Sequence, residues 1–592
     1  MTLRERLGKE WLFFDGGTGT LLQAQGLRGG EQPETWNLLH PEKILALHRQ
    51  YLAAGADILI TNTFGASRFR FGDELPELIR AGVSLAAEAR RAEGREEDAY
   101  IALDIGPGGK LLRPLGDLSF EDAVSAFSEV IAAGADAGAD LVLIETMSDA
   151  AEARAALLAA KETCDLPVFV TCTFDQSGRL LTGGTPHSLI PMLEGLGADA
   201  VGINCSLGPK EMLPLIREVA SLSSLPVIAS PNAGLPDVLD GRTVYPVGPE
   251  AFAGAMREIA QAGAHILGGC CGTTPEHIRL LAEAVRPLPF VPPAEKDRLI
   301  VSSGAAWAEI TPGKTLCVGE RINPSGRKLF RQALQTHNID YLLEQALMQE
   351  DAGAALLDVN VGLPGIDEAA MMEDAVLALQ SVTVLPLQID SSDPKVLERA
   401  LRVYTGRPLV NSVNGKEASL RAVLPAVKKY GAAVIALCLD EDGIPETAEG
   451  RLKIARKIIR RAKECGIPRK NIIFDALTLP ISAVPESAAV TLEALRALRE
   501  ELGCASVLGI SNISFGLPQR AGINAAFLTM AMQNGLSLAI IDPTDPDVRR
   551  AFLSAGALLG QDPQGLRYIE AFAAQAGRPS APAAAVSAPP AG

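Results

Sequence analysis

Residues 140–174 read DLVLIETMSDAAEARAALLAAKETCDLPVFVTCTF and contain one complete strand–helix–strand unit. The runs at 140–147 and 167–174 are apolar throughout, which is typical of strands buried on both faces of a parallel sheet. The Ala/Leu/Glu-rich stretch between them has the spacing of a helix. The first run stops at the polar cluster ETMSD, which marks the carboxyl end of its strand.

The same unit recurs along both halves of the chain. In the first half we expect eight strands, at 12–17, 56–65, 100–107, 140–147, 167–174, 200–206, 226–234 and 265–272. In the second half we expect eight more, at 315–323, 355–362, 386–392, 408–415, 433–440, 472–480, 506–514 and 536–543. Eight strand–helix units of roughly 30 residues form a TIM barrel of about 250 residues. The sequence therefore predicts an α/β protein with two tandem (β/α)8 TIM barrels.

A doubly wound open sheet is the alternative fold. It needs fewer strands in each half and a Gly-rich turn after the first strand. The segment DGGTGT at 15–20 is too short for that turn and does not match it. The two-barrel interpretation is therefore favoured.

The domain boundaries follow from changes in composition. RPLPFVPPAEKDRL at 286–299 is Pro-rich and charged, as linkers often are. We expect a first barrel over residues 1–290, a short linker over 291–314 and a second barrel over 315–572. The Ala/Pro/Ser-rich residues 573–592 lack core-forming side chains, and we expect a disordered tail there.

Charge and composition restrict the partners and the cellular compartment. A formal net charge of −17 disfavours nucleic acid and anionic membranes as partners. No apolar run is long enough for a signal peptide or a membrane span. With nine cysteines and no secretory signal, we expect a reducing, cytoplasmic location, where clustered cysteines indicate metal or catalytic sites.

Three cysteines follow expected strands of the first barrel. Cys205 ends the sixth strand, and Cys270 and Cys271 end the eighth, so all three lie on the rim where TIM barrels carry their chemistry. Three thiolates with one open position describe a catalytic zinc, which would deprotonate an incoming thiol. Three buried structural cysteines are the alternative. The other six cysteines are scattered and are interpreted as core or surface residues.

These cysteines lie in GINCSLGP (202–209) and GGCCGTTPEH (268–277), which closely resemble the homocysteine S-methyltransferase family, as do FDGGTGT (14–20) and TNTFGAS (61–67). The resemblance implies zinc bound by the three cysteines and homocysteine as the thiol. It also implies that Asp15, Glu145 and Asn232 lie near the amino acid part of homocysteine. Local turn chemistry is the alternative role for Asp15 and Asn232.

The expected strand ends of the second barrel are rich in carboxylates and amides, without a cysteine cluster, a histidine or an obvious nucleophile. Such a rim suits a flat heterocycle, because a carboxylate accepts two parallel N–H bonds from its edge. A Mg²⁺ site and structural capping are the alternatives. The residues concerned are Glu320, Asn323, Asp358, Asn360, Asp390, Asn411, Asp475 and Asn512.

GERINPSGRK (319–328) and GISNISFGLPQR (509–520) resemble the pterin-binding methyltransferases, and more narrowly the folate domain of the cobalamin-dependent methionine synthase family. The resemblance implies 5-methyltetrahydrofolate as methyl donor. Asp390 and Asp475 would bind the pterin edge, Asn411 would support it, and Asn512 would lie near N5. Arg520 would contact the folate tail or form a surface salt bridge. Glu320 and Asn323 complete the expected folate-binding set.

Both resemblances together imply an enzyme of methionine biosynthesis that moves a methyl group from methyltetrahydrofolate to cobalamin, and from methylcobalamin to zinc-activated homocysteine. The cobalamin-ligating pattern D-x-H-x-x-G does not occur in the sequence. We therefore expect a cobalamin-binding module in cis, if the chain is a fragment, or in trans. The alternatives are an enzyme that methylates homocysteine directly from a sulfonium donor and a zinc- and folate-binding regulatory protein.

Overall fold

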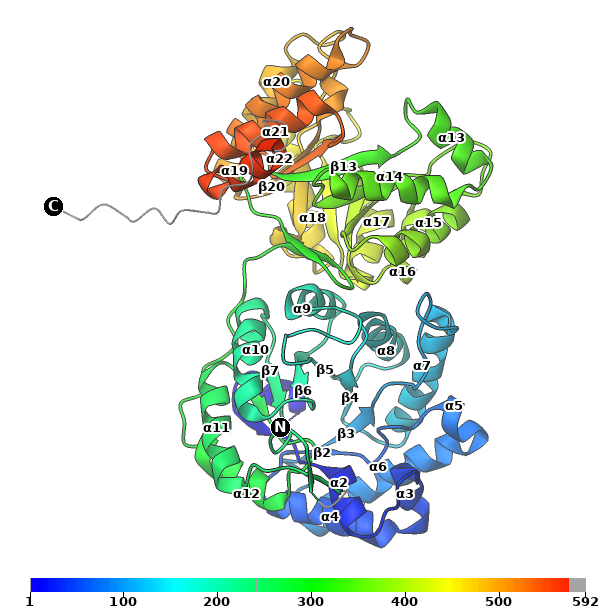
Figure 1. Ribbon diagram of the computed structural model, residues 1–592, viewed down its shortest axis with the longest axis vertical. Helices are drawn as coiled ribbons and strands as arrows, with labels where there is room; N and C mark the ends of the chain where they lie inside the picture. The colour runs from blue at the N-terminus through cyan, green and yellow to red at the C-terminus, as the bar shows by residue number, and fades with distance from the viewer. Residues whose placement is uncertain (1, 240–241, 574–592) are drawn as a thin grey trace, which may run out of the picture.

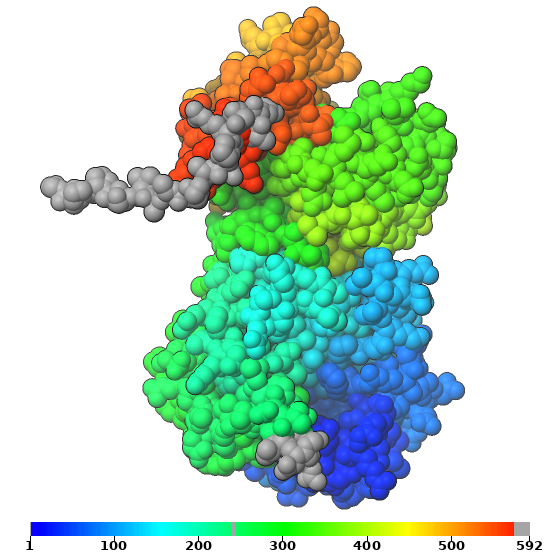
Figure 2. Space-filling view, viewed as in Figure 1, coloured from blue at the N-terminus to red at the C-terminus, as the bar shows by residue number. Residues whose placement is uncertain are grey.

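The computed structural model describes residues 2–239 and 242–573 and has two bodies stacked along the long axis of the molecule (Figure 1). Each body is built on eight parallel strands surrounded by helices, which confirms the prediction of two TIM barrels. Figure 2 shows the two bodies meeting across a narrower waist. None of the helices in the described part of the chain has the length and apolar character needed to cross a membrane.

Barrel 1 has its strands in the order β1-β10-β7-β6-β5-β4-β3-β2, and the parallel bridge Phe14–Ile58 joins its two edges. The strands are β1 (Leu12–Phe13), β2 (Ile58–Ile60), β3 (Tyr100–Ile105), β4 (Leu141–Met147), β5 (Val168–Cys172), β6 (Ala200–Asn204), β7 (Val227–Ser230) and β10 (Ile266–Leu267). The helices are α1 (Leu3–Arg6), α2 (Thr18–Ala24), α3 (Trp36–Leu39), α4 (Pro41–Ala53), α5 (Arg68–Phe71), α6 (Leu75–Ala92), α7 (Phe120–Asp136), α8 (Ala150–Thr163), α9 (Pro186–Gly195), α10 (Pro209–Leu222), α11 (Pro249–Gln261) and α12 (Pro275–Val285).

Barrel 2 is a closed ring of eight strands. They are β13 (Leu316–Ile322), β14 (Leu356–Val359), β15 (Leu387–Asp390), β17 (Leu409–Asn414), β18 (Ala433–Leu437), β19 (Ile472–Asp475), β20 (Ala505–Gly509) and β21 (Leu538–Ile541). The helices are α13 (Lys328–Gln335), α14 (Ile339–Asp351), α15 (Glu368–Val382), α16 (Pro394–Val403), α17 (Glu417–Lys429), α18 (Ala448–Glu464), α19 (Ser487–Leu502), α20 (Arg520–Gln533), α21 (Pro546–Leu558) and α22 (Leu566–Ala573).

The unit at 140–174 shows why the sequence folds this way. Strands β4 and β5 pair in parallel, with Val142 opposite Val168, and both are buried. Asp149 caps α8 by accepting a 3.0 Å hydrogen bond from the amide of Ala151. Alanines cover the buried face of α8, so the helix packs closely on the barrel wall.

The connection between the barrels is more ordered than its Pro-rich composition predicts. The segment 291–314 joins the barrels, as expected of a linker, but it contains β11 (Ile300–Ser303) and β12 (Trp307–Glu309). These strands form a small antiparallel sheet with β16 (Gly406–Arg407), and their apolar side chains pack into the floor of barrel 2. No proline lies between Pro293 and Pro312, and the apolar residues from 299 onward can therefore form strands.

The structure has one further hairpin, β8 (Asp237–Leu239) and β9 (Arg242–Val244), after strand β7. Short 3-10 turns lie at η1 (Pro33–Thr35), η2 (Gly72–Glu74), η3 (Arg469–Asn471), η4 (Ile510–Ser514) and η5 (Pro563–Gly565). The tail expected over 573–592 lies outside the described residues from position 574 onward.

The flank of barrel 1 packs against the floor of barrel 2, where the amino ends of the barrel 2 strands lie. Ser302 of β11 donates a 2.7 Å hydrogen bond to the carbonyl of Ser188 in α9. Arg154 of α8, only 1% exposed, donates to the carbonyls of Leu401 and Arg402 at the end of α16, at 2.5 and 2.7 Å. Because the floor of barrel 2 is covered, its carboxyl-terminal rim opens away from barrel 1.

We expect the substitution Arg154→Met to weaken this interface. It leaves two buried carbonyls without donors, which costs about 1–3 kcal/mol for each group. Urea unfolding should show a lower free energy of unfolding for the first transition. Arg68→Met is the matched control, because Arg68 and Glu129 form a 2.6 Å pair that is partly exposed and contributes ~0–1 kcal/mol. An equal decrease in the free energy of unfolding in the two variants would contradict the role given to Arg154.

Candidate functional site

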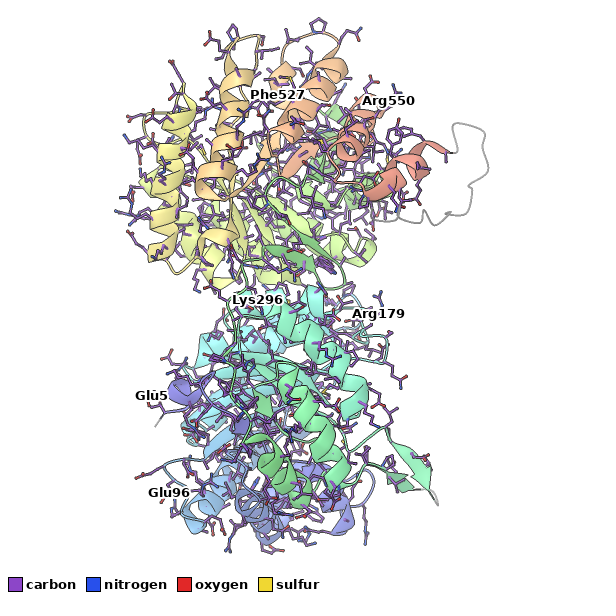
Figure 3. All side chains as sticks on the ribbon, turned by 90° about the vertical axis from the view of Figure 1, so that its left-hand side faces the viewer. Glu5, Glu96, Arg179, Lys296, Phe527 and Arg550 are labelled. Carbon is purple, nitrogen blue, oxygen red and sulfur yellow. The ribbon has the colours of Figure 1, made fainter. Side chains whose placement is uncertain are left out.

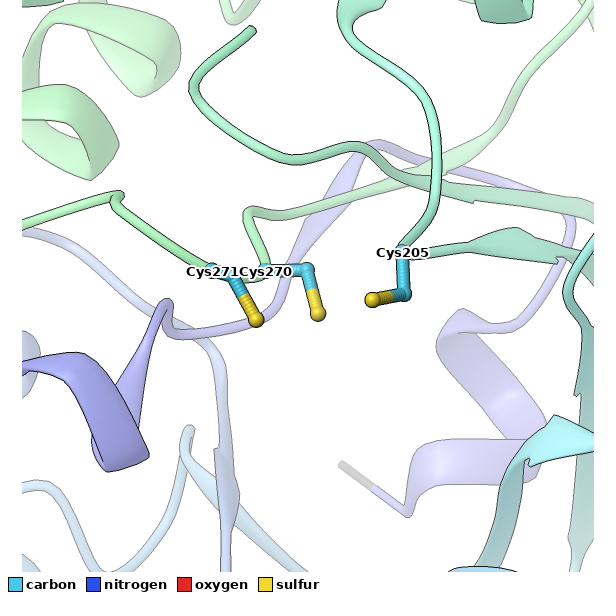
Figure 4. A group of neighbouring side chains, drawn as sticks. All are labelled: Cys205, Cys270 and Cys271. Atoms are coloured by element: carbon cyan, nitrogen blue, oxygen red, sulfur yellow. The ribbon is translucent and has the colours of Figure 1, made fainter. Parts of the chain in front are cut away.

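The three cysteines converge on the carboxyl-terminal rim of barrel 1. Cys205 directly follows β6, and Cys270 and Cys271 lie just after β10, as the sequence predicts. Their sulfur atoms all lie within 4.8 Å of one another. Figure 4 shows the side chains reaching from two loops toward a common point. The other cysteines do not join this cluster.

The backbone is shaped to turn these thiols inward. Cys205 has a φ of 58°, a left-handed conformation that side chains rarely adopt. Gly272 has a φ of +80°, and a Cβ atom there would lie 2.3 Å from the ring of Tyr245. Only glycine can therefore follow the tandem cysteines.

Asn232 fixes the cysteine loop from the end of β7. Its Oδ1 atom accepts a 3.1 Å hydrogen bond from the amide of Cys271, and the carbonyl of Pro231 accepts a 2.9 Å bond from the amide of Cys270. The structure thus places Asn232 beside the metal ligands, with its oxygen committed to the backbone. Its amide nitrogen is the part left for a substrate.

The donor set and its spacing fit zinc. Tetrahedral zinc with Zn–S bonds of about 2.3 Å holds its sulfur ligands ~3.8 Å apart, which is compatible with three sulfurs that all lie within 4.8 Å of one another. Hydrogen bonds from Cys205 and Cys270 lower the pKa of Cys271, whereas the pKa values of Cys205 and Cys270 are raised within the same cluster. Tyr245, which follows the β8–β9 hairpin, adds a further hydrogen bond to Cys271.

Two predicted carboxylates lie on the same rim. Asp15 is fully buried; its Oδ2 accepts a 2.9 Å hydrogen bond from the amide of Ile60, and its Oδ1 has no partner. Glu145, at the end of β4, accepts a 3.3 Å bond from the side chain of Asn204. Burial, followed by the charge of Cys271, raises the pKa of Glu145 to about 7.

Asp104 and Glu34 are two carboxylates of this rim that the sequence analysis missed. Asp104 is 4% exposed and its Oδ1 has no hydrogen-bond partner, and the same holds for Oε2 of Glu34. Burial, and then the charges of Glu145, Asp15 and Glu34, raises the pKa of Asp104 well above its usual value. Asp104 interrupts the apolar run YIALDIGP, and that polar residue inside a buried strand is the signal that could have revealed it.

The buried carboxylates of this rim form a cluster without a counter-charge in the described part of the chain. Among the described residues, none of them forms an ion pair with a lysine, arginine or histidine; the four are Asp15, Glu34, Asp104 and Glu145. Buried carboxylates without a cation are costly. The arrangement therefore favours a ligand that brings its own positive charge. A primary ammonium group, with three donors, meets that requirement.

The rim of barrel 2 brings together four of the predicted polar residues. Asn360 donates a 3.0 Å hydrogen bond to Asp390, and Asp358 is hydrogen bonded by Gln388 at 2.5 Å and by Asn411. Burial raises the pKa of Asp390 to about 6. Gln388, fully buried with Oε1 unpartnered, is another residue that the sequence analysis missed.

Asp475 and Glu320 lie on the same rim. Asp475 ends β19 and accepts a 2.7 Å hydrogen bond from the amide of Leu477, and burial raises its pKa to about 6. Glu320 of β13 accepts a 3.3 Å bond from Arg327 and a 3.1 Å bond from Ser511, so it ties β13 to the turn that carries Asn512.

The remaining predicted folate residues lie at the edge of the rim. Asn323 accepts a 2.9 Å bond from the amide of Ser325, which is local turn chemistry. Asn512 is exposed on η4. Arg520 donates to Ser514 at 3.0 Å and to the carbonyl of Ser511 at 2.7 Å, so it braces this turn and forms no salt bridge among the described residues.

Two models of known protein families match this chain, one over each barrel. The family model described as homocysteine S-methyltransferase matches residues 12–285, and the model described as pterin binding enzyme matches residues 319–542. Methionine synthase from Mycobacterium leprae is 33% identical over 578 residues, which cover 91% of this chain and 48% of the relative. Methionine synthase from Mycobacterium tuberculosis is 33% identical over 575 residues, with the same coverage. The chain spans about half the length of these curated relatives.

Among solved structures, the homocysteine methyltransferase MmuM from Escherichia coli matches in its metallated and apo forms. The metallated form is 26% identical with a TM-score of 0.41, and the apo form is 25% identical with a TM-score of 0.39. Each match covers 48% of this chain and 98% of the solved one. By the two family models, residues 12–285 match homocysteine S-methyltransferase and residues 319–542 match pterin binding enzyme, an arrangement consistent with the N-terminal half of methionine synthase.

Proposed function

We propose that this chain carries the two substrate domains of a cobalamin-dependent methionine synthase. Residues 1–290 would bind zinc and homocysteine, residues 291–314 would connect the domains, and residues 315–572 would bind 5-methyltetrahydrofolate. The observation that carries the proposal is the convergence of three cysteine sulfurs within 4.8 Å on the rim of a homocysteine S-methyltransferase domain.

Cys205, Cys270 and Cys271 are the residues that would hold zinc. When bound, zinc supplies Lewis acidity, which lowers the pKa of a coordinated thiol. The chain contributes the geometry: the left-handed turn at Cys205 and the hydrogen bonds of Asn232 and Pro231 hold the ligand loops in place. Homocysteine would lose its thiol proton to solvent, and its sulfur would then accept the methyl group to give methionine.

Asp15, Asp104 and Glu145 would bind the ammonium group of homocysteine. Each has an oxygen directed to the same rim without a cationic partner, and an ammonium group forms strong charge-assisted bonds with such oxygens. The amide nitrogen of Asn232 would contact the substrate carboxylate. These contacts would orient the thiol toward the three cysteines.

In barrel 2, Asp390 and Asp475 would accept N–H bonds from the pterin edge, with Asn411 supporting the pair through Asp358. Asn512 would lie near N5, where protonation makes the tetrahydrofolate a better leaving group. Asn512 would orient the proton or a water molecule, since an amide is not itself an acid. Glu320, Asn323 and Arg520 would hold the loops around this site.

The two rims do not face each other, so a carrier has to move the methyl group between them. We propose that cobalamin, held by a module in cis or in trans, accepts the methyl group from methyltetrahydrofolate at barrel 2 and delivers it at barrel 1. All nine cysteines are free, and thiolate ligands persist under reducing conditions, which supports a cytoplasmic location.

Cys205→Ser should remove most of the bound zinc and abolish homocysteine methylation, because a serine hydroxyl is a poor substitute for a thiolate ligand. The transfer from methyltetrahydrofolate to free cob(I)alamin should stay within about twofold, since that site lies on a separate barrel. Zinc is measured by atomic absorption, and Cys465→Ser, at an exposed cysteine, is the control. Loss of both half-reactions would contradict the assignment of each half-reaction to a separate barrel.

Asp104→Asn should raise the KM for homocysteine by about 10–100-fold, the cost of ~1.5–3 kcal/mol for a lost hydrogen bond to a charged group. Zinc content should not change, because Asp104 is not a proposed ligand. Steady-state assays with free methylcobalamin measure the KM for homocysteine. An unchanged KM would contradict the assignment of Asp104 to the ammonium group.

Binding of methyltetrahydrofolate should weaken as the pH falls through 6. Asp390 and Asp475 have pKa values of about 6, so they are ionised above that pH, and only the ionised carboxylate accepts N–H bonds with both of its oxygens. Between pH 7.5 and pH 5 the Kd should rise by at least about tenfold, since one pKa unit corresponds to ~1.4 kcal/mol.

Asp475→Asn should weaken binding at pH 7.5 and flatten this pH dependence, whereas Asp442→Asn, at an exposed carboxylate of the same barrel, should change neither. Isothermal titration calorimetry measures the Kd at pH 7.5 and its change with pH. A Kd that is constant from pH 7.5 to 5 would exclude ionised carboxylates as the pterin-binding groups.

A further inference from the structure

A cavity of about 460 Å³ lies between the barrels, apart from both rims. Its walls come from three parts of the chain: helices α9 and α10 of barrel 1, the connecting segment 293–300, and the floor of barrel 2. Figure 3 shows Lys296, one of the lining residues, at the junction of the two barrels.

Four cationic side chains line this cavity without a salt-bridge partner: Lys296, Arg407, Lys428 and Lys470. Within the described residues none of them forms an ion pair, although the whole chain has a net charge of −17. A fifth cation, Arg298, is neutralised by Glu309 through two hydrogen bonds of 2.8 and 2.7 Å. In so acidic a protein, four unpaired cations in one cavity need a physical explanation.

Arg407 is the least expected of the four, because it is only 7% exposed. It donates to the carbonyls of Gly431 and Ile300 at 3.1 and 3.3 Å, and among the described residues no carboxylate forms an ion pair with it, although the charge of Glu194 acts on it from a distance. Burial lowers its pKa to about 10. A buried cation without a counter-ion destabilises the fold, and an anionic ligand would offset that cost.

The acidic groups of the cavity offset this charge only in part: the charge of Glu194 raises the pKa of Arg407, but burial outweighs it. Glu194 accepts a 3.0 Å hydrogen bond from the amide of Ser224, and Glu295 is exposed. Asn471 also lines the cavity, and its buried Oδ1 atom has no donor. Rotating this amide end for end would present two N–H donors to an anion instead.

We propose that this cavity binds a phosphorylated small molecule that carries at least two phosphate groups. Lysine and arginine side chains bind phosphate oxygens by charge-assisted hydrogen bonds, and four cations match a ligand of high negative charge. The overall acidity of the chain disfavours a nucleic acid. Because the lining residues come from both barrels and from the connection, the ligand would fix the barrels relative to each other.

Titration of the full chain with inorganic pyrophosphate, followed by isothermal titration calorimetry, tests the proposal. We expect one site with a micromolar Kd and a higher thermal unfolding midpoint. The double variant Lys428→Gln/Lys470→Gln should weaken binding by at least about tenfold, because it removes two of the four cations that would form charge-assisted bonds with the phosphates. Lys428 is exposed and Lys470 partly exposed, so we expect this variant to fold.

The control variant Lys9→Gln/Lys453→Gln changes the net charge equally at two exposed lysines outside the cavity and should bind pyrophosphate like the parent chain. Sulfate at equal ionic strength should not compete. The proposal is overturned if pyrophosphate does not bind at millimolar concentration, if the cavity variant binds as tightly as the control, or if sulfate binds equally well.

Discussion

A ring of parallel strands places the carboxyl ends of all its strands on one rim, and the chemistry of this chain depends on that constraint. Cys205 and Cys270 are separated by more than sixty residues in the sequence, yet strands β6 and β10 are separated by only one strand in the sheet. The same closure brings Asp15, Asp104 and Glu145 from three further strand ends to the rim. In barrel 2 it brings Asp390 and Asp475 together from β15 and β19.

The two rims differ in their chemistry, as the proposed function requires of sites at opposite ends of a methyl transfer. Barrel 1 combines thiols with buried carboxylates that have no cation, which suits an amino acid thiol. Barrel 2 offers amides and two carboxylates that titrate near pH 6, which suits the donor edge of a heterocycle. The packing of the barrel 2 floor on the flank of barrel 1, through Arg154 and Ser302, keeps the two rims apart.

Much of this arrangement could be predicted from the sequence, because it rests on local patterns. Every barrel strand overlaps a predicted apolar run, and the cysteines follow the strands to which they were assigned. The strands β11 and β12 were missed because β11 pairs non-locally with β16, about a hundred residues away, and β12 pairs only with β11. Asp104 and Gln388 were missed because each lies within a buried strand, where only the closed barrel shows that its side chain faces the site. The surface salt bridge, which was the alternative role for Arg520, is not formed among the described residues; Arg520 donates to its own turn instead, and the geometry of that loop decides this.

The central claim is that Cys205, Cys270 and Cys271 hold a zinc ion with one position open for the homocysteine sulfur. X-ray absorption at the zinc edge tests it most directly, because it counts the sulfur ligands. The account predicts three sulfurs and one lighter atom for the protein alone, and four sulfurs after homocysteine is added. Four sulfurs before homocysteine, or an unchanged spectrum after its addition, would contradict the account.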